Sequence, residues 1–200
     1  MRTKSEARKQ AILDAAAEVF QLEGYERASM DGICRHLGYS KATLYNYFPS
    51  KEELFFEVVF EATSAQFGAI HEALDPGMED LGEALRHFGR SLLALVYSPP
   101  VRAVLRLVAS EAGRGGLGKQ CYEVGASRSL AMLGAYLERA MERGKLRRAE
   151  PRIAALHLLG LLESEWNMLF LCRVRESVSP EEISASVDRA VEVFLRAYGA

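Results

Sequence analysis

The chain has 200 residues, of which 49% are hydrophobic, and a formal net charge of −2. This length allows one large domain or two modest ones with a real hydrophobic core. No segment is long and charge-free enough for a membrane span, and the polar start MRTKSEARKQ lacks the apolar core of a signal peptide. Three scattered cysteines argue against a disulfide framework or a zinc site. We therefore expect a cytoplasmic protein with reduced thiols, no metal and no cofactor.

The first predicted helix runs from Thr3 to about Glu23. Thr3 and Glu6 can form a capping box, and Gly24 can end the helix. Its apolar residues recur at helical spacing, which predicts one buried stripe. The stripe consists of Ile12, Ala16, Val19 and Phe20.

Residues 29–48, SMDGICRHLGYSKATLYNYF, predict two short helices joined by a tight turn. Ser29 and Ser40 are suited to be the N-caps of the two helices, because their hydroxyls can accept hydrogen bonds from free backbone N–H groups. Gly38 suits the left-handed conformation that commonly closes a helix. The apolar positions of the pair are Met30, Ile33, Cys34, Leu37, Leu44 and Phe48.

The second helix of this pair leaves polar and aromatic side chains facing outward. Lysine, threonine and tyrosine suit phosphates, whereas Asn46 can hydrogen-bond an adenine edge in the major groove. An ordinary helical hairpin with a solvated polar face has the same turn, but exposed tyrosines beside a lysine are costly without a use. The pattern favours a helix-turn-helix that binds double-stranded DNA. The predicted DNA-binding residues are Ser29, Met30, Ser40, Lys41, Ala42, Thr43, Tyr45, Asn46, Tyr47 and Lys51.

The segment after the motif supports this interpretation. Pro49 ends the second helix, Ser50 and Glu53 can cap the next one, and Lys51 in its first turn can reach a phosphate. Residues 1–51 carry eight Lys/Arg and six Asp/Glu, a charge of +2, whereas the remainder carries −4. This asymmetry indicates one DNA-facing end on a mildly acidic body.

In order and spacing, these segments resemble the N-terminal domain of the TetR family of bacterial transcriptional regulators. The matching segments are residues 12–16, 19–20, 24–25, 38–40, 43–48 and 50–54. Two positions depart from the family: Cys34 stands where alanine is usual, and Ala42 where glycine is frequent. Both residues are small, so neither threatens the packing or the turn. The resemblance implies a homodimer, a palindromic operator and, usually, repression relieved by a small ligand.

Beyond residue 51 the periodicity predicts further helices and no strand. The expected ranges are 51–74, 78–97, 101–112, 119–143, 151–175 and 180–198. Breaks are expected at Asp75-Pro76-Gly77 and Ser98-Pro99-Pro100. The glycine-rich residues 113–118 lack the ending of a phosphate-binding loop, so we interpret them as a connector. The fold class is therefore all-α, with a three-helix DNA-binding domain at residues 1–50 and a helical ligand-binding and dimerisation domain at residues 51–200.

The last two predicted helices indicate a subunit interface. Residues 153–171 are apolar almost all round, and a helix that is apolar on every side must be covered on every side. We expect a two-fold interface, a four-helix bundle with two helices from each subunit, and a fully intramolecular core is the alternative. The predicted interface residues are Leu158, Leu162, Phe170, Val187, Val191, Phe194 and Tyr198.

Aromatic and polar side chains of the middle helices indicate a ligand cavity, although core packing is the default role of such residues. Glu163 and Glu165 interrupt the most apolar helix and cannot both face one side. A buried one would need a partner or a raised pKa, whereas a solvated carboxylate needs neither. The ligand-binding candidates are Phe60, Phe67, His71, Phe88, Leu105, Val108, Tyr122, Tyr136, Glu163, Trp166 and Asn167.

The part of the chain from Arg147 onward weakly resembles the AefR-like subtype of the family, which implies no particular ligand. We expect a dimeric regulator, a repressor released from a palindromic operator by a small hydrophobic or amphipathic ligand that moves the helix at 51–74. Activation in place of repression stays open. The alternative is a ligand-independent DNA-binding or protein-interaction module. An enzyme is disfavoured, because no nucleophile–base or metal spacing is present.

Cysteine chemistry offers little further function. Cys34 and Cys172 are expected in the core, and Cys121 is expected at the surface. A redox role for Cys121 would need a lowered thiol pKa, and Lys119 is the only nearby residue in the sequence that could lower it.

Overall fold

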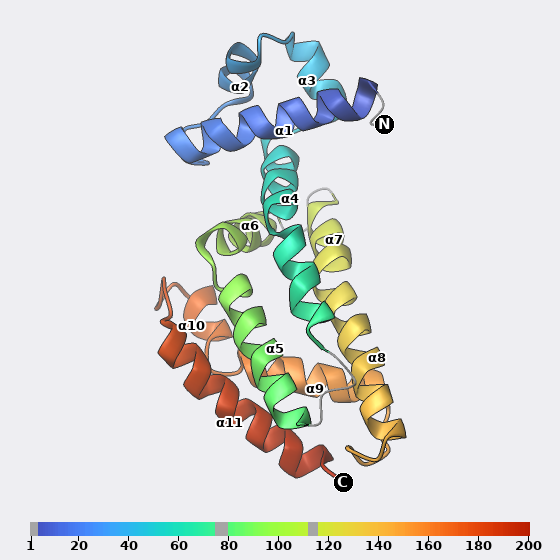
Figure 1. Ribbon diagram of the computed structural model, residues 1–200. Coiled ribbons are helices and arrows are strands. Elements are labelled where there is room, and N and C mark those ends of the chain that lie inside the picture. The colour runs from blue at the N-terminus through green and yellow to red at the C-terminus, as the bar shows by residue number, and fades with distance from the viewer. Residues whose placement is uncertain (1–3, 75–79, 112–115) are drawn as a thin grey trace. The chain divides into compact units, whose positions relative to one another are not determined.

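The computed structural model describes residues 4–74, 80–111 and 116–200 (Figure 1). Over these ranges the chain is all-α, as predicted, and its described residues form no strand. One isolated antiparallel bridge joins Leu146 and Gly199. The chain divides into two compact units, residues 1–64 with 103–117 and residues 65–102 with 118–200. This division differs from the predicted boundary at residue 50, because the following helix begins in the first unit.

The first unit contains α1 (Lys4–Glu23), α2 (Met30–Leu37), α3 (Lys41–Tyr47), the start of α4 (Lys51–Glu72) and the end of α6 (Pro99–Ser110). Helix α2 packs against both α1 and α3 (Figure 1). The buried side chains come from all these helices, so α3, the second helix of the predicted helix-turn-helix, packs against a core that they share. Its most buried members are Ile12, Ala16, Ile33, Leu44, Leu54 and Phe56.

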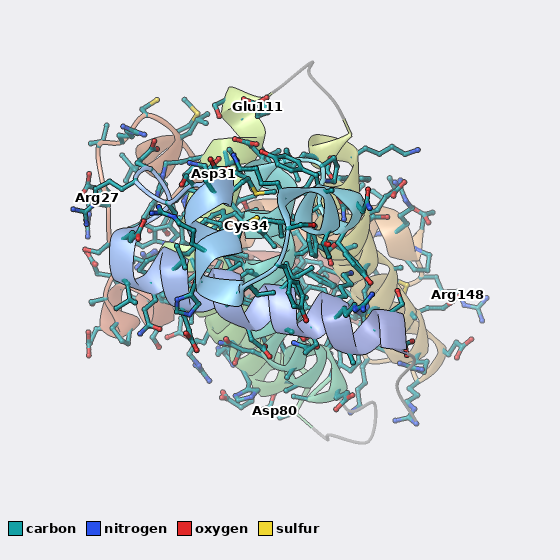
Figure 2. The ribbon with its side chains drawn as sticks, turned by 90° about the horizontal axis from the view of Figure 1, so that it is seen from above. Arg27, Asp31, Cys34, Asp80, Glu111 and Arg148 are labelled. Atoms are coloured by element: carbon teal, nitrogen blue, oxygen red, sulfur yellow. The ribbon has the colours of Figure 1, made fainter. Side chains whose placement is uncertain are left out.

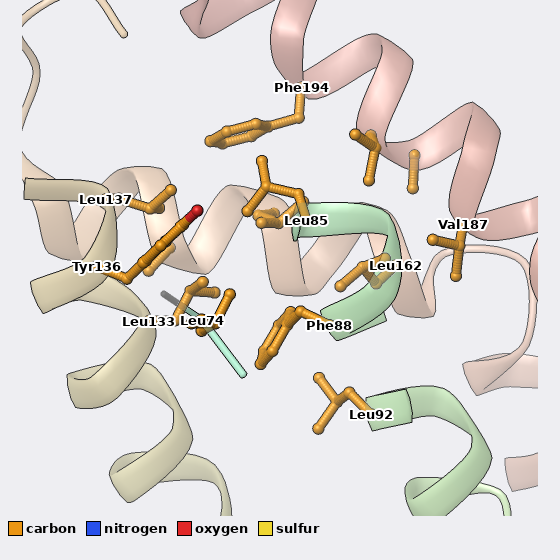
Figure 3. Close-up of a cluster of buried hydrophobic side chains, with 14 of the residues drawn as sticks. Leu74, Leu85, Phe88, Leu92, Leu133, Tyr136, Leu137, Leu162, Val187 and Phe194 are labelled. Carbon is orange, nitrogen blue, oxygen red and sulfur yellow. The ribbon is translucent and has the colours of Figure 1, made fainter. Parts of the chain in front are cut away.

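The second unit is built around α5 (Leu81–Val96), α8 (Arg128–Glu142), α9 (Pro151–Glu163) and α11 (Pro180–Tyr198). Helix α11 packs along both α5 and α9, and α8 packs against α9. Figure 3 shows side chains from these four helices meeting in one apolar cluster. Its fully buried members include Leu85, Phe88, Leu133, Leu137, Leu158, Leu162, Val187, Val191 and Phe194.

The start and end signals of several helices act as predicted. Gly24 and Gly38 adopt left-handed backbone, with φ of 77° and 70°. The Ser50 hydroxyl accepts a hydrogen bond from the Glu53 N–H, and Ser179 forms a complete capping box at the start of α11. Thr3, the Asp75-Pro76-Gly77 break and the expected start at Met78 lie outside the described residues. In the described part, α5 begins after its N-cap Asp80.

The helix predicted at 119–143 begins earlier and changes its winding. It consists of α7 (Leu117–Tyr122), a π-helical turn η1 (Glu123–Ser127) and α8. Leu117 and Gly118, predicted to belong to a connector, are therefore helical, and residues 113–115 of that connector lie outside the described residues. Helix α6 likewise begins at Pro99, because proline is well tolerated in the first helical turn.

The helix predicted at 151–175 is broken, so that expectation is wrong. Helix α9 ends at Glu163, residues 164–166 form a turn, and a short helix α10 (Asn167–Leu171) follows. The Ser164 hydroxyl donates to the carbonyl of Leu161, a local bond that competes with the helical ladder. The Trp166 indole donates to the Ser186 hydroxyl at 2.9 Å and ties the break to α11.

The residues predicted to form the subunit interface are buried within a single chain. All seven predicted residues, Leu158, Leu162, Phe170, Val187, Val191, Phe194 and Tyr198, are at most 7% exposed within a single chain. They pack the core of their own unit and present little surface to a partner, so their assignment to the interface stays an untested prediction. The same helices expose other apolar side chains instead, namely Ile153, Leu156, Met168, Leu171 and Val193.

No single helix among the described residues is long and apolar enough to cross a membrane, and only α5 and α6, bent by 64°, satisfy the length and composition criteria together.

The cysteines are placed only partly as expected. Cys34 is buried, Cys121 is partly buried, and Cys172 is exposed, which corrects its predicted place in the core. Burial raises the pKa of the Cys121 thiol, so the structure gives that thiol no activated thiolate.

Candidate nucleic-acid interface

The turn between α2 and α3 is fixed by hydrogen bonds at its caps. The Ser29 hydroxyl accepts from the Gly32 N–H at 3.1 Å, and the Ser40 hydroxyl accepts from the Thr43 N–H at 3.2 Å. The Gly38 N–H donates to the carbonyl of Cys34 and closes α2. These bonds satisfy helix-end groups that otherwise lack partners, and they set where α3 begins.

The core holds α3 by one face. Leu44 and Phe48 are 2% and 3% exposed, and Ile33 of α2 is fully buried. With these positions anchored, helical spacing turns the remaining residues of α3 outward. The inward stripe predicted from the sequence is therefore confirmed, except that Leu37 is only partly buried.

The outward face of α3 carries the chemistry of the site. Lys41, Ala42, Tyr45 and Asn46 are exposed, whereas Thr43 and Tyr47 are partly buried; Tyr45 is 46% exposed. Asn46 offers an amide donor and acceptor, the pair of groups that binds an adenine edge, and Tyr45 offers a phenolic donor for a phosphate.

Two predicted contacts are partly occupied within the protein. The Thr43 hydroxyl lies 2.9 Å from the Ser40 hydroxyl, and the Tyr47 hydroxyl lies 3.3 Å from the Ser5 hydroxyl of α1. Each hydroxyl keeps further hydrogen-bonding capacity, so these contacts orient the side chains without removing them from the surface.

An ion pair joins the two helices of the motif. The Lys41 ammonium donates to the Asp31 carboxylate at 2.6 Å, and this hydrogen bond raises the pKa of Lys41. Figure 2 shows Asp31 and Cys34 on α2. Asp31 and Lys41 help to line a surface hollow of about 480 Å³, to which Arg35 and Tyr39 also contribute. Neither Arg35 nor Tyr39 is among the predicted DNA-binding residues, although Arg35 lies one helical turn beyond Asp31.

Two predicted DNA-binding side chains have other roles. Met30 is 7% exposed and packs in the core, so its predicted contact through the side chain is wrong. The Lys51 ammonium donates to the carbonyls of Tyr25 and Ala28, at 2.9 and 3.2 Å, and lies 4.2 Å from the centre of the Tyr25 ring. Lys51 therefore fastens the 25–28 loop to α4, because its donors are directed at the backbone.

A sequence model described as bacterial regulatory proteins, tetR family, matches residues 12–58, and one described as AefR-like transcriptional repressor, C-terminal domain, matches residues 83–200. The second match alone covers more than half of the chain. The chain belongs to the TetR family. It is therefore a DNA-binding transcriptional regulator, and both the expected family and the expected AefR-like C-terminal part are confirmed.

Similar solved structures cover nearly the whole of this TetR-family chain. A TetR-family regulator from Mesorhizobium loti is 30% identical, covers 100% of both chains and superposes with a TM-score of 0.83. The flavonoid-responsive regulator FrrA is 31% identical, with 96% of this chain and 98% of its own covered and a TM-score of 0.70.

Curated relatives match over a shorter region. The A-factor receptor protein of Streptomyces griseus is 40% identical over 38% of this chain and 29% of its own length. The regulator UidR of Escherichia coli is 32% identical over 38% of each chain. The chain thus spans about a third of the length of these curated relatives.

The predicted ligand-binding residues of this TetR-family regulator fall into both units. Phe60, Leu105 and Val108 belong to the first unit, and the other eight belong to the second. Tyr122 is 52% exposed and Asn167 is also exposed, so neither is enclosed within its unit. Phe88, Tyr136 and Trp166 are buried in the core.

The most enclosed polar candidate is His71. Its Nδ1 lies 2.8 Å from the Phe67 carbonyl, and its Nε2 lies 2.9 Å from the Ser129 hydroxyl. The carbonyl can only accept, so Nδ1 carries the proton and Nε2 accepts from Ser129. Burial lowers the pKa of His71, and the nearby Arg128 charge lowers it further. A neutral His71 therefore links α4 to α8 within the second unit.

The two glutamates at the α9–α10 break differ as their sequence positions predicted. Glu165 receives two hydrogen bonds from Arg189, at 2.8 and 2.7 Å, and this ion pair lowers the pKa of Glu165. Glu163 is partly buried, and burial raises its pKa. Over the described residues, no group of three His, Cys, Asp or Glu side chains is arranged to hold a metal ion.

Proposed function

We propose that the chain is a homodimeric repressor that binds a palindromic operator and releases it when a small hydrophobic or amphipathic ligand binds. The observation that carries this proposal is the exposed Tyr45–Asn46 face of α3, held by caps at one end and by Leu44 and Phe48 beneath. The match of residues 83–200 to an AefR-like repressor domain supports repression.

The apolar surface of the second unit supports dimerisation. Ile153 and Leu156 of α9 and Val193 of α11 are 43%, 41% and 51% exposed. Ile153 and Leu156 are three residues apart and share one side of their helix. Exposed apolar side chains on neighbouring helices are typical of a surface that a second subunit covers. Two-fold symmetry would then supply the second reading helix that a palindrome requires.

Helix α4 supports a mechanism by which ligand binding in the second unit changes operator binding by the first. It is one continuous helix whose residues up to Ser64 belong to the first unit and whose later residues, including His71, belong to the second. A ligand that binds better to the form with low operator affinity would shift the population toward that form. One similar structure is named as flavonoid-responsive, which supports an organic effector for this chain as well.

The ligand-independent alternative also has an observation in its favour. The cavity of the second unit lined by Leu81, Tyr136, Ala140, Arg143 and Lys145 has a volume of only about 10 Å³. That volume suits a single water molecule, so an organic ligand would have to displace packed side chains.

The test is a selection of bound fragments from random double-stranded DNA with the full-length protein. We expect an inverted repeat whose half-sites lie about one helical turn apart, around 10 base pairs. Asn46→Ala should flatten the preference at one base pair of each half-site, whereas the matched control Asn167→Ala, an exposed asparagine of the other unit, should leave it unchanged. Enrichment of unpaired half-sites would contradict the dimeric part of the proposal. Absence of any enriched sequence would contradict operator recognition.

A further inference from the structure

A polar cluster in the second unit is not explained by packing. Arg102, on the first turn of α6, is only 9% exposed. Its guanidinium carbon lies 5.7 Å from the centre of the Tyr97 ring and 5.1 Å from that of Phe170. The two rings lie 4.6 Å apart, and both residues are at most 5% exposed. A buried cation is therefore held between the end of α5 and α10.

Two hydroxyls in this cluster are buried without a hydrogen-bond partner among the described residues. They are the Tyr97 hydroxyl and the hydroxyl of Ser98, the next residue in the chain. Buried polar groups in native proteins are almost always paired, so two neighbouring exceptions require an explanation. Phenylalanine at position 97 would fill the same space without that cost.

A carboxylate completes the cluster. Glu163 is the last residue of α9, and the charge of Arg102 opposes the burial that raises the pKa of Glu163. Burial, followed by the charge of Glu163, raises the pKa of Tyr97. Tyr97, Arg102 and Glu163 therefore lie within electrostatic range of one another. Glu163 ends α9 and Phe170 lies in α10, so the break between these helices separates the two members of the cluster.

We propose that Tyr97, Arg102 and Glu163 form the polar end of the effector site and that they bind the hydroxyl group of a hydroxylated aromatic ligand. This inference rests on the ligand response proposed above. The ligand hydroxyl donates to the Glu163 carboxylate and accepts from the Tyr97 hydroxyl, while the charge of Arg102 stabilises the ligand oxygen. The ligand ring then lies against Phe170 and Tyr97, where aromatic pairs are favourable.

The charges of the cluster select this class of ligand. Glu163 repels a carboxylate, and Arg102 repels an ammonium group. A neutral hydroxyl both donates and accepts, so it satisfies a carboxylate and a tyrosine together. An ether of the same shape cannot donate to Glu163. A buried acceptor left unpaired makes such a ligand bind more weakly.

Access to the cluster requires movement of α10. This helix has five residues and lies between the 164–166 break and Arg173, whose φ of 56° is left-handed. So short a helix has few internal hydrogen bonds to hold it in place. The polar ties described at the break, from the Trp166 indole to Ser186 and from Arg189 to Glu165, precede α10 in the chain and can persist while α10 moves.

The test is isothermal titration calorimetry on the full-length protein with 2-naphthol, 2-methoxynaphthalene and 2-naphthoate. We expect 2-naphthol to bind and the other two to bind at least about tenfold more weakly, the effect of one lost hydrogen bond to a buried group. Tyr97→Phe and Glu163→Gln should each weaken 2-naphthol binding by about tenfold. Glu165→Gln, at the salt-bridged glutamate of the same unit, is the matched control and should bind as the parent does.

Thermal melts separate binding from folding. Because the Tyr97 hydroxyl has no described partner, Tyr97→Phe should melt no lower than the parent. The proposal is overturned if the parent does not bind 2-naphthol, or if Tyr97→Phe and Glu163→Gln bind it as tightly as the parent.

Operator affinity measured in the same samples keeps the two proposals apart. Intact operator binding without 2-naphthol binding would overturn this subsite alone. Binding of 2-naphthol that depends on Tyr97 but leaves operator affinity unchanged would contradict the proposed ligand response and leave the subsite standing.

Discussion

At the scale of single residues, the α2–α3 surface that is proposed to bind DNA carries an acidic side chain, Asp31, whose charge repels phosphate. Asp31 holds the Lys41 ammonium at 2.6 Å, and its own negative charge lies at the hollow that Arg35 and Lys41 also line. A phosphate entering this region must compete with Asp31 for Lys41. We therefore expect the aspartate to lower general affinity for DNA and to leave the proposed contact of Asn46 with a base edge unaffected.

We predict that Asp31→Asn increases affinity for all DNA sequences by about two- to tenfold at low salt, because a charge that repels phosphate is removed and Lys41 is released. The salt dependence of binding should steepen by about one counterion. Fluorescence anisotropy with specific and random duplexes measures both quantities. Glu18→Gln, which removes an exposed carboxylate of α1 that pairs with His36 of α2, is the control. Equal or weaker binding by Asp31→Asn would count against this role.

His71 gives the second unit a response to acid. Its pKa in the folded protein is lowered by burial, whereas in the unfolded chain it is near the ordinary value of about 6.5. As the pH falls through about 6.5, the unfolded state therefore takes up a proton first, and the free energy of unfolding falls.

We predict that His71→Leu flattens the dependence of melting temperature on pH between about 7 and 5. The variant also loses the hydrogen bond to Ser129, at a cost of about 1–3 kcal/mol, so the slope and not the absolute stability is compared. His87→Gln, an exposed histidine of the same unit, is the control. A His71→Leu slope as steep as that of the parent would show that other groups cause the acid response.

At the scale of helices, the sequence predicted where most elements lie. It did not predict the break between α9 and α10 or which faces of these helices are buried. Caps and periodicity located α1 to α5 and α11, because Ser29, Ser40 and Ser179 act locally. The apolar residues between 153 and 171 gave no preferred face. Their pattern could not show that the inward positions are already filled by α5, α8 and α11 of the same chain. Nor could it show that the Trp166–Ser186 bond stabilises a break.

One close approach between helices depends on a glycine. An ideal Cβ on Gly89 of α5 would lie 2.7 Å from Leu162 Cδ2 and 2.9 Å from Val187 Cγ1. Both neighbours are at most 1% exposed and appear within the apolar cluster of Figure 3. Neither side chain has free space into which it can move.

We predict that Gly89→Ala lowers the free energy of unfolding by about 1–2 kcal/mol, since overpacking at α9 and α11 outweighs the gain in helix propensity. Gly68→Ala in α4 is the matched control, because its Cβ would meet nothing within 4 Å. That control should be neutral or stabilised by up to about 1 kcal/mol. Urea unfolding followed by circular dichroism measures both. A stabilised Gly89→Ala variant would mean that α5 can shift away from its neighbours.

At the scale of the whole molecule, the proposed function requires two copies of the chain, although the second unit already has a buried core of its own. The residues expected at the subunit interface are buried inside one chain, so we propose that the interface uses the side chains that α9 and α11 leave exposed. The family, the fold class and the reading helix followed from sequence because their signals are local. The interface and effector contacts did not, because they depend on which sides of the helices the chain itself covers.

We predict that the double substitution Ile153→Glu, Leu156→Glu converts a dimer into a folded monomer. Two carboxylates in an apolar interface would be desolvated without partners, whereas in the monomer both side chains remain in water. Sedimentation velocity reports the oligomeric state, and circular dichroism reports the fold. Val174→Glu, an apolar side chain that is 68% exposed outside these helices, is the control. A double variant that remains a dimer would place the interface elsewhere.

The Trp166–Ser186 bond at the α9–α10 break has a spectroscopic consequence. Trp166 is the single tryptophan of the chain, it is only 6% exposed, and the guanidinium carbon of Arg175 lies 5.9 Å from its ring. The tryptophan emission of the protein therefore originates at one known point, between α9, α10 and α11. Any conformational change that exposes the Trp166 indole to water shifts the emission to longer wavelength. Trp166 fluorescence is thus an intrinsic probe next to α10, the helix whose movement the proposed ligand site requires.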